Sequence, residues 1–127
     1  MNKMFHSQYF PKLYTWDIET EVSDEFPDPE LANQKVTAIS LVGPDMSCIV
    51  YGLHNLSNDK IELFRKRYLE WVENNEFAKN YRDTKLNGKQ PKVLYQYFMT
   101  EEEMLRHFFT KIIPNVPALA GWNSYNF

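Results

Sequence analysis

The first half of the chain contains three short apolar runs, which polar segments separate. The runs cover residues 14–20, 35–42 and 47–53, and they are rich in residue types that favour β-strands. Gly43-Pro44-Asp45 gives a turn signal between the second and third runs. We therefore expect three strands, of which the second and third pair antiparallel as a hairpin.

The pattern then changes to the spacing of a helix. Over residues 59–75, apolar side chains recur with a period of about 3.6 residues, which predicts an amphipathic helix. Residues 79–92 are polar and contain Asn87-Gly88, so they are interpreted as a loop. The apolar and aromatic run at residues 93–99 predicts a fourth strand.

A second helix is expected directly after this fourth strand. Thr100 and Glu103 have the spacing of a capping box, which marks the start of a helix. The helix is expected over residues 101–113, and Pro114 ends it. Its apolar side chains are interpreted as one core-facing side, made by Met104, Leu105, Phe108, Phe109 and Ile112. Residues 118–122 predict a short fifth strand.

The resulting order of elements is β-β-β-α-β-α-β. An antiparallel meander followed by helix-linked strands, which we expect to be parallel, gives an α/β fold with a mixed sheet flanked by helices. This order is similar to that of the ribonuclease H-like (RNase H-like) fold, in which the first strand is central. A chain of 127 residues is long enough to form one domain of this kind.

Composition narrows the possible classes of protein. Apolar residues make up 43% of the chain, which argues for a folded domain. The single cysteine, Cys48, cannot form an intrachain disulfide and favours a reducing, intracellular setting. A net charge of −3 argues against a protein that holds duplex DNA through phosphate contacts alone. The sequence contains neither a run long enough to span a membrane nor a recognisable signal peptide, so we expect no membrane partner.

The candidate chemistry lies at the end of the first strand, in Asp17-Ile18-Glu19-Thr20. Alternate residues of a strand point to the same face, so Asp17 and Glu19 should project together while Ile18 points into the core. Two adjacent carboxylates are typical hard-oxygen ligands for Mg²⁺ or Mn²⁺. The alternative interpretation is a solvated strand end with no bound ion.

Two segments at opposite ends of the chain carry a resemblance to a known family. Asp17-Ile18-Glu19-Thr20 resembles the first exonuclease motif of family B DNA polymerases. Gly121-Trp122-Asn123-Ser124-Tyr125-Asn126-Phe127 resembles the second motif, up to one residue before its aspartate. Phe26-Pro27-Asp28-Pro29 is most similar to the polymerases of T-even-like bacteriophages. The resemblance spans roughly residues 12–127 and rests on both motifs in this order.

This resemblance implies a 3′→5′ proofreading exonuclease that hydrolyses the terminal phosphodiester with two divalent cations, Mg²⁺ or Mn²⁺. It assigns the catalytic and metal-binding roles to Asp17 and Glu19, and the third and fourth acidic ligands to residues after Phe127. The resemblance further implies DNA contacts at Ile18, Thr20, Phe26, Asn123 and Phe127. For Phe26, stacking on an unpaired base and anchoring of the acidic loop are both open. Residues 1–127 are accordingly expected to be the first part of the exonuclease domain, without its C-terminal part or a polymerase domain, and to have little activity alone.

The expected partners are a single-stranded 3′ end of DNA, the remainder of the polymerase chain, and a sliding clamp reached through that remainder. The expected location is the cytoplasm, which for a phage protein is that of the host cell. Two alternatives differ in class. One is an assembly module from a split gene, which needs a second chain to complete the enzyme. The other is a stand-alone RNase H-like nuclease.

Overall fold

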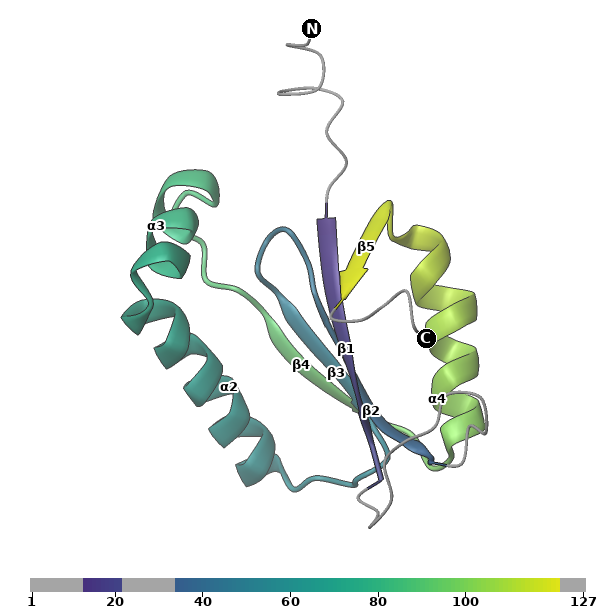
Figure 1. The fold of residues 1–127 in the computed structure, drawn as a ribbon. Helices are drawn as coiled ribbons and strands as arrows, with labels where there is room; N and C mark the ends of the chain where they lie inside the picture. Colours follow the sequence, from purple (N-terminus) through teal and green to yellow (C-terminus); the bar gives the residue numbers. More distant parts are fainter. Residues whose placement is uncertain (1–12, 22–33, 122–127) are drawn as a thin grey trace, which may run out of the picture.

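The computed structural model describes residues 13–21 and 34–121, which form a five-stranded mixed sheet with helices on both of its faces (Figure 1). The strand order is β4-β3-β2-β1-β5. The strands have these bounds: β1 Leu13–Thr20, β2 Val36–Val42, β3 Cys48–Gly52, β4 Val93–Tyr97 and β5 Ala118–Gly121. Helices α2 (Asn58–Asn74) and α3 (Glu76–Lys85) lie on one side, and α4 (Glu101–His107) lies on the other.

Strand pairing follows the predicted topology. The pairs β1–β2 and β2–β3 are antiparallel, whereas β3–β4 and β1–β5 are parallel. This arrangement confirms the meander and the helix-linked parallel strands. Strand β1 lies in the interior of the sheet, between β2 and β5, and Thr15 and Trp16 are paired on both sides.

A hydrophobic cluster lies between the sheet and α4, while Val72 of α2 and Ala78 of α3 are buried beneath the other helices. The buried residues of the cluster are Ile39, Tyr51, Met104 and Phe108, of which Met104 and Phe108 come from the helical segment. Trp16 stacks on Phe108 with ring centroids 5.9 Å apart. Burial of several large side chains on this face fixes the position of β1 relative to α4.

The prediction of a loop over residues 79–92 is wrong, because Glu76–Lys85 forms helix α3. Asn75 ends α2 and its side chain accepts a hydrogen bond from the Ala78 N–H at 2.9 Å, which begins the next helix. Arg82, a charged residue, occupies a buried position of α3 and pairs with Glu73 and Asp83. The polar sequence showed no helical pattern of apolar residues, because a buried position of this helix holds a charged residue stabilised by ion pairs.

The C-terminal end of α3 explains the Asn87-Gly88 signal. Gly88 has a φ of +76°, and its N–H donates to the Arg82 carbonyl at 3.0 Å. Left-handed residues with such back-bonds are typical helix ends. The dipeptide marks the end of a helix, not the middle of a loop.

The second predicted helix is also more irregular than expected. The Thr100 hydroxyl accepts a hydrogen bond from the Glu103 N–H at 3.2 Å, which confirms the N-cap. After His107 the α-helix changes to a π-helical segment, Phe108–Ile112, and then to a 3-10 turn, Ile113–Asn115. The wider π turn shifts the side chains that follow it. Phe109, within this π-helical segment, is 56% exposed, so its assignment to the core is wrong.

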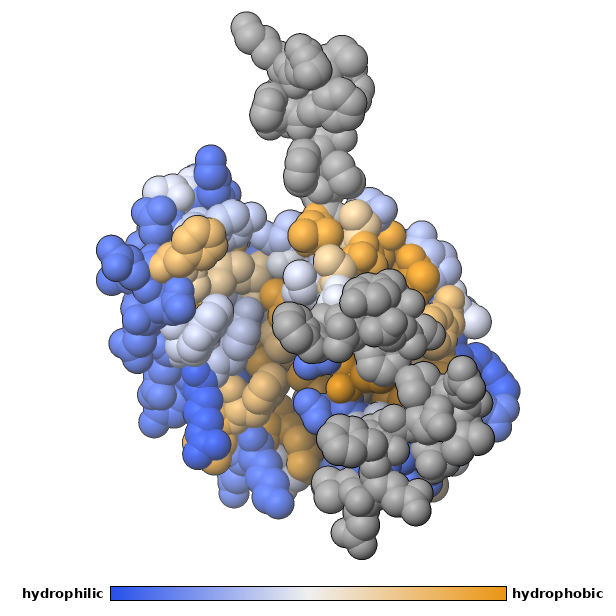
Figure 2. All heavy atoms as spheres, in the orientation of Figure 1, coloured by the Kyte–Doolittle hydropathy of each residue, from blue (hydrophilic) through white to orange (hydrophobic). Residues whose placement is uncertain are grey.

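Polar side chains cover the outer surface of α2, and apolar side chains lie between this helix and β1 (Figure 2). Among the residues that the structure describes, no helix has the length and apolar character needed to cross a membrane.

Candidate functional site

Strand β1 carries two sets of side chains whose exposure alternates along all its residues. Asp17 and Glu19 are exposed, together with Leu13 and Thr15 on the same face. Trp16 and Ile18 are half-buried and pack against the core cluster on the opposite face. The predicted placement of the two carboxylates, side by side and away from Ile18, is confirmed.

Small residues flank the two carboxylates on the neighbouring strand. In the β1–β2 ladder, Asp17 lies opposite Ser40 and Glu19 lies opposite Ala38. Directly paired residues of an antiparallel ladder share a face, with their Cβ atoms about 5 Å apart. Ser40 and Ala38 therefore leave space beside the carboxylates for an ion or a substrate group.

The surroundings of the carboxylates suit a hard cation. The Ile18 N–H donates to Asp17 Oδ1 at 2.9 Å. The ion pairs formed within residues 13–21 and 34–121 use other acids, namely Glu21, Glu62, Glu73, Asp83 and Glu102. The described cations thus leave the oxygens of Asp17 and Glu19 without a salt bridge, and two unneutralised carboxylates on one face fit Mg²⁺ or Mn²⁺.

The same residues are too few for a complete metal centre. Within the two described ranges, no group of three or more His, Cys, Asp or Glu side chains could hold a metal ion. Divalent ions of this kind take six or more oxygen ligands, several of them often from water. Asp17 and Glu19 fit as part of such a site, and further protein ligands would come from elsewhere.

The backbone around Glu19 contains an irregularity that the sequence did not indicate. The β1–β2 register shifts between Glu19 and Thr20. Next to this shift, the Thr37 hydroxyl donates to the Glu19 carbonyl at 3.2 Å, and the Val36 N–H donates to Glu101 Oε2 at 2.5 Å. Glu101 had been assigned only to the first turn of a helix.

The other residues named from the sequence fall into two groups. Ile18 faces the core, so only its backbone is available to a ligand, and the Thr20 hydroxyl donates to Gln34 Oε1 at 3.3 Å. The other named residues lie outside the described ranges, namely Phe26, Asn123 and Phe127. Their assignment to DNA binding stays a prediction.

Two tyrosines, Tyr68 of α2 and Tyr95 of β4, remain neutral hydrogen-bond donors. Burial raises the pKa of Tyr68 to about 12, with smaller contributions from Cys48 and Asp45, and its hydroxyl donates to the Met46 carbonyl at 2.5 Å. Burial also raises the pKa of Tyr95, whose hydroxyl donates to the His54 carbonyl at 2.5 Å. Neither phenol is suited to act as a base at neutral pH.

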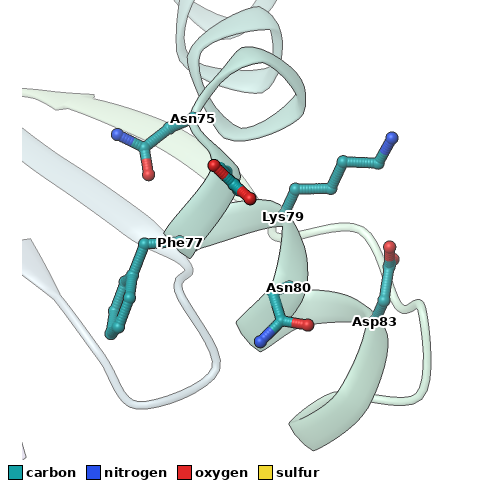
Figure 3. A pocket seen from close by; sticks show the side chains of 6 residues that line it. Asn75, Phe77, Lys79, Asn80 and Asp83 are labelled. Atoms are coloured by element: carbon teal, nitrogen blue, oxygen red, sulfur yellow. The ribbon is translucent and has the colours of Figure 1, made fainter.

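Two hollows lie away from the carboxylate pair. A shallow one surrounds the start of α3, where Phe77 points away from Lys79 and Asp83 (Figure 3). The other is an apolar groove, which is lined by residues that include Leu13, Thr15, Trp71, Phe77 and Tyr81. Leu13 and Thr15 place this groove on the same face of β1 as Asp17 and Glu19.

Comparison with known proteins identifies the family. The model of the exonuclease domain of family B DNA polymerases matches residues 1–127. The described sheet and helices agree with this match, since they form the α/β arrangement of an RNase H-like exonuclease domain. No curated protein sequence matches the chain. The carboxylate pair on β1, the mixed sheet and the family match lead to one conclusion: the chain belongs to the exonuclease domains of family B DNA polymerases.

Proposed function

We propose that this chain contributes to a 3′→5′ proofreading exonuclease, in which Asp17 and Glu19 are the first two acidic ligands of a divalent-metal site. The observation that carries the proposal is the exposed pair of carboxylates on one face of β1, free of salt bridges to the described cations. Membership of the exonuclease family supplies the class of substrate, a 3′ end of DNA.

Three residues of β1 have distinct parts in this proposal. Asp17 and Glu19 hold their oxygens toward solvent, where they can bind Mg²⁺ or Mn²⁺. Ile18 anchors the strand between them by packing against the core. When bound, a pair of such ions supplies an activated water and stabilises the leaving 3′ oxygen. The side chains themselves provide the negative charge and the fixed spacing on which that chemistry depends.

The proposal includes the remainder of the polymerase. The third acidic ligand is the aspartate of the second motif and the fourth lies further along the polymerase chain. The DNA contacts of the single strand include Phe26, Asn123 and Phe127. Residues 1–127 are then part of an exonuclease domain, and the polymerase activity and any sliding-clamp contact belong to the remainder. The similarity at Phe26-Pro27-Asp28-Pro29 supports an origin among T-even-like bacteriophages and a site of action in the host cytoplasm.

The proposal is tested by metal-dependent digestion of single-stranded DNA. A chain extended to include the third and fourth acidic ligands should release nucleotides from the 3′ end with Mg²⁺ or Mn²⁺, while residues 1–127 alone should release far fewer. In the extended chain, Asp17→Asn and Glu19→Gln should each reduce the rate by at least about 100-fold, because they remove a ligand charge. The matched control is Glu70→Gln, an exposed acid of α2. Equal rates for D17N and E70Q would contradict the proposal.

A second candidate, an assembly module, is favoured by one observation. The apolar groove contains Leu13, Trp71 and Phe77, which are 48%, 52% and 82% exposed. Large exposed apolar patches commonly mark protein interfaces. The occupant proposed is the remainder of the polymerase, supplied by the same or a second chain. Protection of Trp71 from fluorescence quenchers when that remainder is added would support it, and unchanged quenching would count against it.

A further inference from the structure

We propose that Thr37 is a positioning residue that fixes the orientation of Glu19, and that Glu101 supports it from α4. This inference rests on the proposed function of the carboxylate pair. It concerns residues of β2 and α4, two elements that carry none of the acidic ligands considered so far. Three separate hydrogen bonds at one point of the sheet carry it.

The first step is the register of the two strands. Glu19 pairs with Ala38, whereas the next residue, Thr20, pairs with Val36. Thr37 is therefore the extra residue of a β-bulge, opposite the peptide that joins Glu19 to Thr20. Bulges break the regular ladder, bend the strand and redirect nearby side chains, and they occur often next to active sites.

The second step is the way in which Thr37 is held. Its carbonyl accepts a hydrogen bond from the Leu53 N–H at 3.0 Å, on the side of β3. Its hydroxyl donates to the Glu19 carbonyl at 3.2 Å, on the side of β1. The extra residue is thus tied to both neighbouring strands. A side-chain hydroxyl supplies a hydrogen-bond donor to the Glu19 carbonyl beside the bulge.

The third step is the contact from α4. Val36 lies beside the bulge, and its N–H donates to Glu101 Oε2 at 2.5 Å. A hydrogen bond to a carboxylate is stronger than one between neutral groups. The N-cap Thr100 fixes the start of α4 directly before Glu101. The same helix places Met104 in the core, so the bulge is joined to a rigid part of the molecule.

These contacts determine the peptide plane between Glu19 and Thr20. Fixing the Glu19 carbonyl fixes the direction of its Cα–Cβ bond relative to that of Asp17, two residues earlier. Shared metal ligation requires both carboxylates to point to one position. The Thr37–Glu19 bond is exposed, so water can replace the lost donor when Thr37 is changed. Loss of the hydroxyl should therefore alter metal affinity more than it alters folding.

The test uses Mn²⁺ as the probe and the 127-residue chain labelled with ¹⁵N. Paramagnetic broadening of the Ile18, Glu19 and Thr20 amide signals reports the ion at β1, even at millimolar affinity. Thr37→Val should weaken Mn²⁺ binding by roughly 3- to 10-fold, the range expected for one hydrogen bond. Thr37→Ser keeps a hydroxyl and should restore wild-type affinity. The urea midpoint should change little in either variant.

Thr84→Val is the matched control, because Thr84 also donates its hydroxyl to a backbone carbonyl, that of Asn80 at 2.7 Å, away from β1. It should leave Mn²⁺ affinity unchanged. Glu101→Gln, which retains an acceptor, should weaken binding less than Glu101→Ala. Equal affinity of T37V and wild type would overturn the inference while leaving the proposed function intact. Wild-type signals that do not respond to Mn²⁺ would overturn the inference, while the exonuclease assay of the extended chain decides the proposed function.

Discussion

Asp17 lies directly opposite Ser40 in the antiparallel ladder of β1 and β2. Both strands are interior to the sheet, so neither can move away to accommodate a change at this pair. Cross-strand neighbours of this kind have Cβ atoms about 5 Å apart, within reach of a long side chain. A charge introduced at position 40 would therefore act on the Asp17 carboxylate at short range.

Ser40→Lys should reduce divalent-metal affinity at β1, because its ammonium group would compete with the ion for the Asp17 carboxylate. An opposite charge at about 4 Å near a protein surface is worth several kcal/mol before desolvation, so we expect at least a tenfold loss of Mn²⁺ affinity. Ser40→Ala should leave the affinity within about twofold of wild type. Titration of the Ile18 and Glu19 amide signals with Mn²⁺ measures both. An unchanged affinity in S40K would show that Asp17 is not a ligand.

Two neighbouring phenylalanines test the irregular end of the α4 segment. Phe108 is fully buried and stacks on Trp16, whereas Phe109 is 56% exposed. Phe108→Ala should lower the free energy of unfolding by about 3–5 kcal/mol, because it leaves a cavity under β1. Phe109→Ala should lower it by less than about 1 kcal/mol. Urea unfolding of the two variants measures this difference, and similar losses would contradict the different burial of the two side chains.

The five strands begin and end within two residues of the predicted runs, because these runs are rich in residues that favour strands and are bounded by polar or turn segments. The shared face of Asp17 and Glu19 follows from the two-residue period of a strand, and the alternating exposure along β1 shows it. Helix α3 was missed because one of its two buried positions holds Arg82, whose pairing with Glu73 and Asp83 is evident only in three dimensions. The bulge at Thr37 was also missed. Its supporting contact joins Val36 to Glu101, residues far apart in the chain, and no local pattern encodes such a pairing.

Acidification should weaken the ion pair that holds α3 against α2. The hydrogen bond from Arg82 holds the pKa of Glu73 below its ordinary value of about 4.3. A carboxylate with a lowered pKa in the folded state stabilises that state above its unfolded pKa. This stabilisation is lost as the pH falls through the lowered value. The melting temperature of wild type should therefore fall between about pH 5 and pH 3.

Glu73→Gln should lower the melting temperature at pH 7 and reduce this fall, because glutamine does not titrate. Glu70→Gln, an exposed change on the same helix, should keep the wild-type dependence on pH. Scanning calorimetry across this range measures the three proteins. A parallel decline of E73Q and wild type would mean that other carboxyl groups cause the acid loss of stability.

Gly121 permits the close approach of β5 to β1, where it lies opposite Trp16 in the parallel ladder. A Cβ atom at this position would lie 2.6 Å from Trp16 Nε1 and 2.8 Å from the Trp16 carbonyl oxygen. The indole can rotate, but the carbonyl belongs to an interior strand and cannot withdraw. Gly121→Ala should therefore lower the free energy of unfolding by roughly 1–3 kcal/mol and change the fluorescence of Trp16.

Gly88→Ala separates this steric effect from the general cost of replacing a glycine. A Cβ at Gly88 meets nothing within 4 Å, but the residue has a φ of +76°. Its substitution should cost about 1–2 kcal/mol through backbone strain alone and leave the tryptophan emission unchanged.

Since β5 leads directly into the segment that resembles the second exonuclease motif, displacement of β5 in G121A should also reduce exonuclease activity of the extended chain. Full activity in G121A would show that the β1–β5 contact is not needed to place that motif.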